Sequence, residues 1–311
     1  ASAMGGCISP IEEENGYDPA YSAAANIASA PTGLLIPPTS AFIVYSTVAG
    51  GVSISTLFMA GYVPGILMGL CCMLVAFIGA KKAGMKATGY DKSKSIGKTI
   101  WDAVPSLLLI VIVIGGIVSG IFTATEGAGI AVLYCLILSI VYKSITFKSF
   151  LKILLDSAKT SGIILFLISA SSAMSFVMAY SGIPAAISNG LMSLTSNKYF
   201  LLMNIILLVM GMFMDITPAI LIFTPIFLPI ATSFGMTEIQ FGVMLIFNMC
   251  LGNITPPVGS VLFVGCGIGH VSIEQVTSKL IPYFVALVLA LLAVTYIPAL
   301  SLGLPSLMGL I

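Results

Sequence analysis

The amino-acid sequence predicts an all-α integral membrane protein made of two inverted repeats, each with a re-entrant helical hairpin and a broken transmembrane helix. Three observations support this fold class: an apolar composition, two matched helix breaks and an uneven distribution of lysines. Of the 311 residues, 59% are hydrophobic and only 7% are charged. Such a composition is typical of a chain that crosses a membrane several times.

Paired prolines mark the two breaks. Leu251–Gly259 contains Pro256-Pro257 between two apolar runs, and a second pair, Pro37-Pro38, interrupts an earlier run. Proline cannot continue a helix, because it lacks an N–H group and clashes with the preceding turn. In hydrocarbon, the freed backbone groups need partners inside the protein or from a bound ligand. A break at membrane depth therefore predicts a binding site.

The breaks belong to an internal repeat. A shift of 219 positions aligns residues 10–55 with residues 229–274 without a gap, and 11 of the 46 aligned pairs are identical. The identical residues include the glycines and prolines that set the backbone path. One break alone is equally consistent with a structural kink. Matched breaks in two halves of a chain indicate the site of a secondary transporter.

The first repeat is expected to span residues 1–80. A short helix over 1–14 is part of a hairpin, Asp18-Pro19 opens a broken helix over 20–49, and 53–80 is a full span, because about 25 apolar residues cover about 37 Å. Residues 81–160 then hold, in order, a lysine-rich loop at 81–98, spans at 104–122 and 125–142, and an interfacial helix at 144–159.

The second repeat is expected to span residues 161–302. Its elements are, in order, a span at 161–180, an interfacial segment at 183–194, a hairpin at 199–231, a broken helix at 238–268 and a span at 275–302. The hairpin arms, Tyr199–Met214 and Ala219–Ala231, are short for a hydrocarbon core of about 30 Å. A hairpin that enters and leaves on one side of the membrane is therefore expected.

The lysines set the predicted orientation. All twelve basic residues are lysines, and cytoplasmic loops are enriched in basic residues. Placing loop 81–98 in the cytoplasm makes loop 143–159 cytoplasmic as well, leaves only Lys198 outside and puts the C-terminus in the periplasm. The two repeats are then inverted. Because the lysines flank spans and lack interleaved aromatic residues, no nucleic-acid partner is expected.

Asp215 is the main single candidate for a functional residue. It lies at the predicted hairpin tip, and a carboxylate at membrane depth costs about 2.5–3.5 kcal/mol. Asp215 either contacts a cation or substrate, or caps the half-helix that begins at Thr217-Pro218. The breaks add backbone carbonyls and polar side chains whose oxygens suit hard cations; the side chains are those of Thr39, Ser40, Asn253, Thr255 and Ser260.

Other polar residues favour a transport protein over an enzyme. Glu126 fits a helix-capping position after Thr123, and His270, the only histidine, is expected at the surface. With one histidine and no serine or cysteine beside a suitable base, the sequence offers little for catalysis. An ion channel is the rival class, but a channel does not need paired, inverted sites.

Six motifs also carry a family resemblance: Gly16-Tyr17-Asp18-Pro19, Gly33-Leu34-Leu35-Ile36-Pro37-Pro38-Thr39-Ser40, Leu57-Phe58-Met59-Ala60-Gly61, Thr123-Ala124-Thr125-Glu126, Thr224-Pro225-Ile226-Phe227-Leu228-Pro229 and Gly252-Asn253-Ile254-Thr255-Pro256-Pro257-Val258-Gly259. Over essentially its whole length the chain resembles the large, DctM-like membrane subunit of tripartite ATP-independent periplasmic (TRAP) transporters. The resemblance implies a sodium-driven elevator importer in the bacterial inner membrane. Its partners would be a small four-helix membrane subunit and a periplasmic substrate-binding protein that delivers an organic acid.

The resemblance also implies site residues, with sodium as the coupling ion and no other cofactor. Sodium sites of the family lie between each hairpin tip and the adjoining broken helix. They transfer here to a first set, Gly33, Pro37, Thr39 and Ser40, and to a second set, Asp215, Thr217, Gly252, Asn253, Thr255 and Pro256. Because this segment has no arginine for a bidentate carboxylate clamp, the substrate's carboxylate is expected to meet half-helix N-termini, hydroxyls, lysine or bound sodium. The candidate substrate residues are Thr39, Ser40, Thr217 and Ser260.

Two features depart from the family pattern. The N-terminal helices and the first hairpin tip are missing, so the chain is expected to be N-terminally truncated and its first sodium site incomplete. Glu12-Glu13-Glu14 also replaces a customary basic residue. A stand-alone sodium/carboxylate symporter of related fold is a further alternative. The substrate, whether a C4-dicarboxylate, sialic acid or another sugar acid, is left open.

Overall fold

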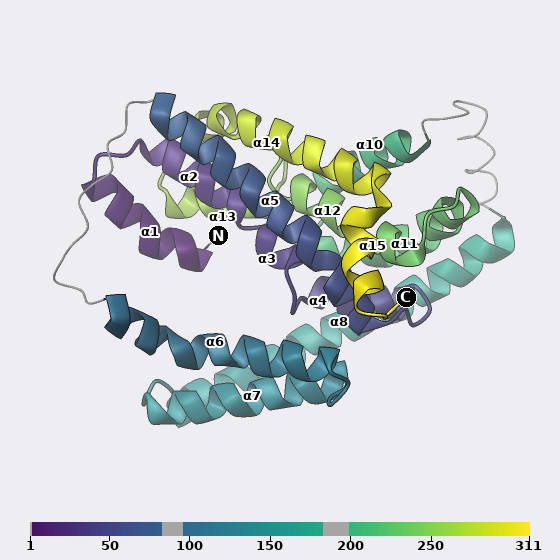
Figure 1. Ribbon diagram of the computed structural model, residues 1–311, viewed down its shortest axis with the longest axis horizontal. Helices are drawn as coiled ribbons and strands as arrows, with labels where there is room; N and C mark the ends of the chain where they lie inside the picture. The colour runs from purple at the N-terminus through teal and green to yellow at the C-terminus, as the bar shows by residue number, and fades with distance from the viewer. Residues whose placement is uncertain (1, 83–95, 183–198) are drawn as a thin grey trace. The chain divides into compact units, whose positions relative to one another are not determined.

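The computed structural model describes residues 2–82, 96–182 and 199–311, and all the regular structure in these ranges is helical (Figure 1). The predicted all-α class is therefore confirmed. The chain forms two compact units, one made of Ala1–Thr88 with Ser171–Ile311 and the other of Gly89–Ala170. The predicted interfacial segment 183–194 and most of loop 81–98 lie outside the described residues.

The first predicted broken helix is interrupted, as expected. Helix α1 (Ser2–Glu14) precedes α2 (Pro19–Ser29), whose N-terminus is capped by the Asp18 carboxylate. A single helical turn, α3 (Thr32–Leu35), follows, and then α4 (Ser40–Val48) and the long helix α5 (Ile54–Lys82). The axis bends by 48° between Pro19–Leu35 and Ser40–Val48. We call residues 30–39, which include α3, the first break.

The second broken helix is interrupted at the corresponding place. The elements of this part are α10 (Tyr199–Gly211), α11 (Ile216–Ser233), α12 (Glu238–Gly252), α13 (Ser260–Ile268), α14 (Ile273–Tyr296) and α15 (Pro298–Leu307). We call residues 253–259 the second break and residues 212–215 the turn. The span predicted at 275–302 corresponds to α14, but it ends earlier than expected, because the chain leaves α14 at Ile297 and Pro298 opens a new helix.

The second arm of the predicted hairpin is longer than expected. Helix α11 has 18 residues and begins at Ile216, because the Asp215 side chain caps it there. It is one of three described helices that are long and apolar enough to cross a membrane; the others are Ile54–Lys82 and Ile273–Tyr296, and the bent pair α2–α4 would make a fourth. Whether α11 crosses or re-enters the membrane stays a prediction.

The two broken helices pack against each other in opposite directions. A β-carbon on Gly269 or on Gly265, at the end of α13, would meet Ala23 or Ile27 in α2. At the other end, Gly242 in α12 lies against Tyr45 in α4. Helices α5 and α14 also pack together (Figure 1). Repeat-related segments therefore face each other across one core.

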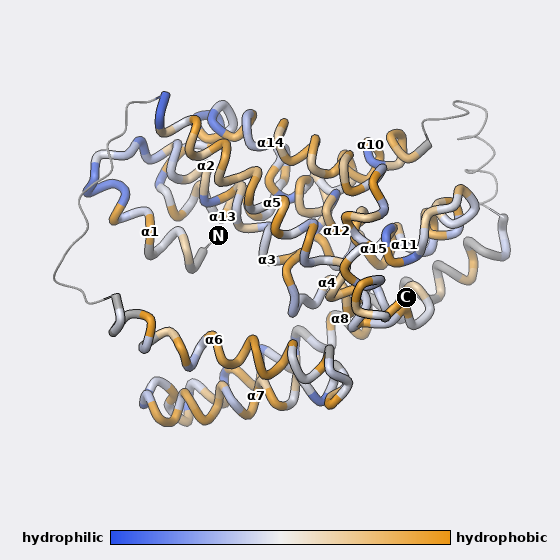
Figure 2. The backbone as a smooth tube through the Cα atoms, viewed as in Figure 1, coloured by the Kyte–Doolittle hydropathy of each residue, from blue (hydrophilic) through white to orange (hydrophobic). Residues whose placement is uncertain are grey.

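The second unit contains a helical pair. Helices α6 (Ile96–Val118) and α7 (Ala124–Val141) lie antiparallel, since Tyr134 donates to the Pro105 carbonyl oxygen at 2.7 Å and Gly127 lies against Ile117. Both helices are largely apolar (Figure 2). Separate helices over 144–159 and 161–180 were expected, but one helix, α8 (Phe147–Ser181), covers both. Gly162 is the helix-weakening residue near the boundary between the two predicted helices, and one glycine does not end a helix.

Candidate functional site

The turn before α11 and the second break lie against each other. The Asp215 Oδ1 atom accepts hydrogen bonds from the Ile216 N–H at 3.0 Å and from the Asn253 side-chain amide at 3.4 Å. Asp215 is exposed in the described structure, whereas Asn253 is buried. The carboxylate is thus a helix cap and, at the same time, a link to the break.

Backbone contacts strengthen this junction. The Gly259 N–H donates to the Met212 carbonyl oxygen at 3.4 Å. A β-carbon on Gly252 would lie only 2.3 Å from the carbonyl carbon of Gly211. Helices α10 and α12 can approach this closely only because neither residue has a side chain. The two segments that carry most of the second predicted sodium set, the turn and the second break with Gly252 before it, therefore meet.

Oxygen atoms converge inside the second break. A β-carbon on Gly259 would lie 2.9 Å from the carbonyl oxygens of both Asn253 and Thr255. The backbone carbonyl oxygen of Asn253 also accepts hydrogen bonds from the N–H groups of Val261 and Leu262, at 3.2 and 3.4 Å, at the start of α13. The Thr255 hydroxyl donates to the Leu251 carbonyl oxygen at 2.7 Å, and Pro256 beside it is half-buried. Carbonyl, hydroxyl and carboxylate oxygens are the ligands that hard cations prefer.

The first break is packed on its own long helix. Pro37 and Thr39 are buried, and the Thr39 hydroxyl caps α4 by accepting from the Ala41 N–H at 3.3 Å. Gly33 and Ser40 are exposed. The backbone of the break presses on α5: a β-carbon on Gly61 would lie 2.5 Å from the Leu35 carbonyl oxygen.

The first break also touches α12, the helix that leads into the second break. The Cys250 thiol lies 3.6 Å from the Pro31 carbonyl oxygen, in a buried contact. These residues are 219 positions apart, which is the offset of the internal repeat. Residues that occupy equivalent places in the two repeats can touch only near the axis that relates the repeats. The two predicted ion sites therefore lie on either side of one shared contact.

The four hydroxyls predicted for the substrate come from three helices. Thr39 and Ser40 lie at the start of α4, Ser260 at the start of α13, and Thr217 in the first turn of α11, which packs against α4. Among the described residues, no hydrogen bond joins any two of these four. Ser40 and Ser260 are exposed, and Thr217 is half-buried.

Sequence reasoning overlooked the glycines that admit the breaks. Gly61 and Gly65 lie four positions apart on one face of α5, and a β-carbon on Gly65 would be 2.5 Å from Ile36. Gly211 plays the corresponding part for Gly252. Small residues spaced by four in an apolar helix are a known signal of close helix packing. That signal was present in the sequence at Gly61 and Gly65.

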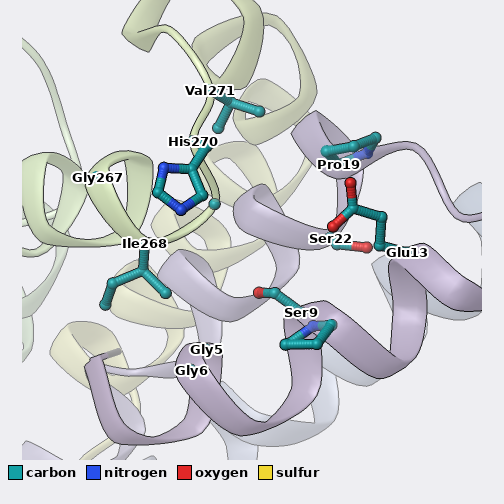
Figure 3. A pocket seen from close by; sticks show the side chains of 12 residues that line it. Gly5, Gly6, Ser9, Glu13, Pro19, Ser22, Gly267, Ile268, His270 and Val271 are labelled. Carbon is teal, nitrogen blue, oxygen red and sulfur yellow. The ribbon is translucent and has the colours of Figure 1, made fainter.

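A cavity of about 720 Å³ lies apart from both breaks. Figure 3 shows His270, from the turn after α13, and Glu13, from α1, among its lining side chains. His270 is exposed, as predicted. Glu126 also has its predicted structural role, because its carboxylate accepts from the Thr123 N–H at 2.8 Å in a capping box at the start of α7.

Comparison with known proteins identifies relatives over nearly the whole chain. A family model described as the DctM component of the tripartite ATP-independent periplasmic transporter matches residues 1–300. The uncharacterized protein YgiK of Salmonella typhimurium is 48% identical over 99% of this chain and 71% of its own length. The isethionate TRAP transporter permease protein DctMQ of Oleidesulfovibrio alaskensis is 36% identical over 97% of this chain and 48% of its own. The C4-dicarboxylate TRAP transporter large permease protein DctM of Rhodobacter capsulatus is 33% identical, over 99% and 74%.

Proposed function

This chain belongs to the DctM component family of tripartite ATP-independent periplasmic transporters, which are membrane transport proteins rather than enzymes, and we propose that it imports a small organic acid across the bacterial inner membrane together with sodium. The sodium gradient drives this import. In this proposal the two breaks hold the sodium ions. The half-helices that begin at Ser40 and Ser260 face the substrate. Movement of the repeats as an elevator then exposes the site to each side in turn.

The junction between Asp215 and Asn253 carries the proposal. It puts one carboxylate from the turn against a break that supplies two converging carbonyl oxygens and a hydroxyl. A carboxylate there also offsets the charge of a cation, which neutral oxygens alone cannot do. Sodium bound at the junction would tie the turn to the break, so that ion occupancy changes the freedom of the helices next to the substrate.

The relatives support an anionic substrate without fixing it. Two of the relatives have names that state a substrate, isethionate in one and C4-dicarboxylates in the other, and both are small organic anions. The start of a helix attracts an anion through its free N–H groups and its dipole. We therefore propose that this chain transports an organic acid and works with a small membrane subunit and a periplasmic substrate-binding protein.

Transport by the complete system tests the proposal. The full permease, its small subunit and its binding protein are reconstituted in liposomes and offered isethionate, succinate or sialic acid under an inward sodium gradient. Uptake of at least one anion should saturate and should stop when potassium replaces sodium. Uptake that is the same in potassium, or flux that does not saturate and needs no binding protein, would contradict it in favour of an uncoupled carrier or a channel.

A further inference from the structure

A cluster of buried polar side chains joins α10, α12 and α14. We call Asn204, Gln240, Asn248 and Thr295 the polar cluster; each is at most 4% exposed. The Asn248 amide donates to the Asn204 side-chain oxygen at 2.6 Å, and the Asn204 amide donates to the Thr295 hydroxyl at 3.1 Å. The Gln240 amide donates to the Thr295 carbonyl oxygen at 2.9 Å. The cluster lies outside every predicted site.

The cluster and the junction lie on the same interface. Asn204 contacts Asn248, and Gly211 contacts Gly252 further along the same two helices. The two contacts are seven residues apart in α10 and four apart in α12, spacings that return to the same face of a helix. Helices α10 and α12 therefore run side by side in the same direction, with the cluster at one end of their contact and the turn at the other.

The surrounding hydrogen bonds are satisfied by only one orientation of the side-chain amides of Asn204 and Asn248. The Asn248 amide nitrogen also donates to the Met244 carbonyl oxygen at 2.9 Å, and that of Asn204 to the Phe200 carbonyl oxygen at 2.9 Å. The Asn248 side-chain oxygen has no partner among the described residues. A buried acceptor without a donor is unfavourable, so simple packing does not explain asparagine at this position.

We propose that Asn204 and Asn248 are positioning residues, which fix α10 along α12 so that residues 212–215 stay on the second break. This inference rests on the proposed function, because the place they hold in register is the proposed sodium site. Gln240 belongs to the same cluster but links α12 only to α14. It therefore stabilises the protein without setting the position of the turn.

Sodium binding by the complete, purified transporter tests this role without knowledge of the substrate. The melting temperature is measured while sodium chloride replaces choline chloride at constant total salt. Asn204→Leu should raise the sodium concentration that gives half of the stabilisation by about threefold to tenfold, the range expected when a buried interhelical hydrogen bond is lost. Gln240→Leu, the matched control, should lower the melting temperature without sodium and leave that midpoint unchanged.

Each outcome decides one of the two claims. A parent protein that sodium stabilises no more than choline contradicts the proposed sodium coupling. A parent that responds, with Asp215→Asn shifted but Asn204→Leu at the parent's midpoint, overturns the positioning role. An equal shift in Gln240→Leu overturns it as well. Should Asn204→Leu not fold, Asn204→Ser and Asn248→Ser replace it, and the double variant should shift no further than either single one.

Discussion

At the residue scale, the Asp215 carboxylate offers both hydrogen-bond acceptors and a negative charge, and one substitution can separate these two roles. One of its oxygens, Oδ1, caps α11 and also accepts from Asn253. The side-chain oxygen of asparagine can accept both hydrogen bonds, and asparagine is itself a good helix cap. Replacement by asparagine therefore removes the negative charge and leaves the local geometry in place.

This separation gives a sharp prediction in the full-length transporter. Asp215→Asn, Thr217→Ala and Asn253→Ala should each raise the half-saturating sodium concentration for uptake, about tenfold for every 1.4 kcal/mol of binding free energy lost. Expression should fall less than sodium dependence. Uptake measured over a range of sodium concentrations checks this. The parent's sodium curve in all three variants would mean that the second break is structural only, and a parental curve in Asp215→Asn alone would reduce Asp215 to a cap.

At the element scale, α5 is the surface on which the first break rests. Its glycines form a stripe in which Gly61 meets the Leu35 carbonyl oxygen and Gly65 meets Ile36. Further along the stripe, Gly69 has more room, since a β-carbon there would lie 3.7 Å from Thr32. The same substitution at two positions of one helix face should therefore have opposite consequences.

Gly61→Ala should destabilise the protein, because the added methyl group overlaps the break and the Phe42 ring; overpacking of this kind costs about 1–3 kcal/mol. Gly69→Ala should be neutral or stabilising by up to about 1 kcal/mol, since alanine favours the helix. Melting temperatures of the purified variants compare the two. Equal melting temperatures would show that the first break does not depend on close contact with α5.

At the scale of the whole molecule, equivalent interactions recur in both repeats with different residues. Tyr21 donates to the Ala76 carbonyl oxygen at 2.6 Å, and Gln240 donates to the Thr295 carbonyl oxygen at 2.9 Å. Each residue of the second pair lies 219 positions after its counterpart. In each repeat the first half of the broken helix is thus bonded to the long helix that follows, while the antiparallel packing of the broken helices gives the repeats opposite directions.

The predicted orientation follows from those directions and from the lysines. Lys82, at the exposed end of α5, should face the cytoplasm, and Ser306, exposed in α15, should face the periplasm. In intact cells, a membrane-impermeant maleimide should label Ser306→Cys at once and Lys82→Cys only after permeabilisation. The parent chain, with its six cysteines, sets the background. Labelling of Lys82→Cys in intact cells would overturn the orientation.

The sequence alone determined the all-α class, the two breaks and the family. Paired prolines and glycines act through local backbone geometry, so Pro37-Pro38 and Pro256-Pro257 interrupt a helix whatever its tertiary contacts are. Asp18 and Asp215 likewise cap the helices that follow them. These signals need only neighbouring residues, and they were readable before any contact was known.

Only the tertiary structure decided which distant atoms meet. That Cys250 touches Pro31, that Gly211 admits Gly252 and that Asn204 pairs with Asn248 depends on helix rotation and register, which a uniformly apolar sequence does not specify. The hydrophobic effect has no direction and cannot choose among apolar faces. Close glycine contacts and a few buried hydrogen bonds make that choice, and they place the turn 212–215 on the second break.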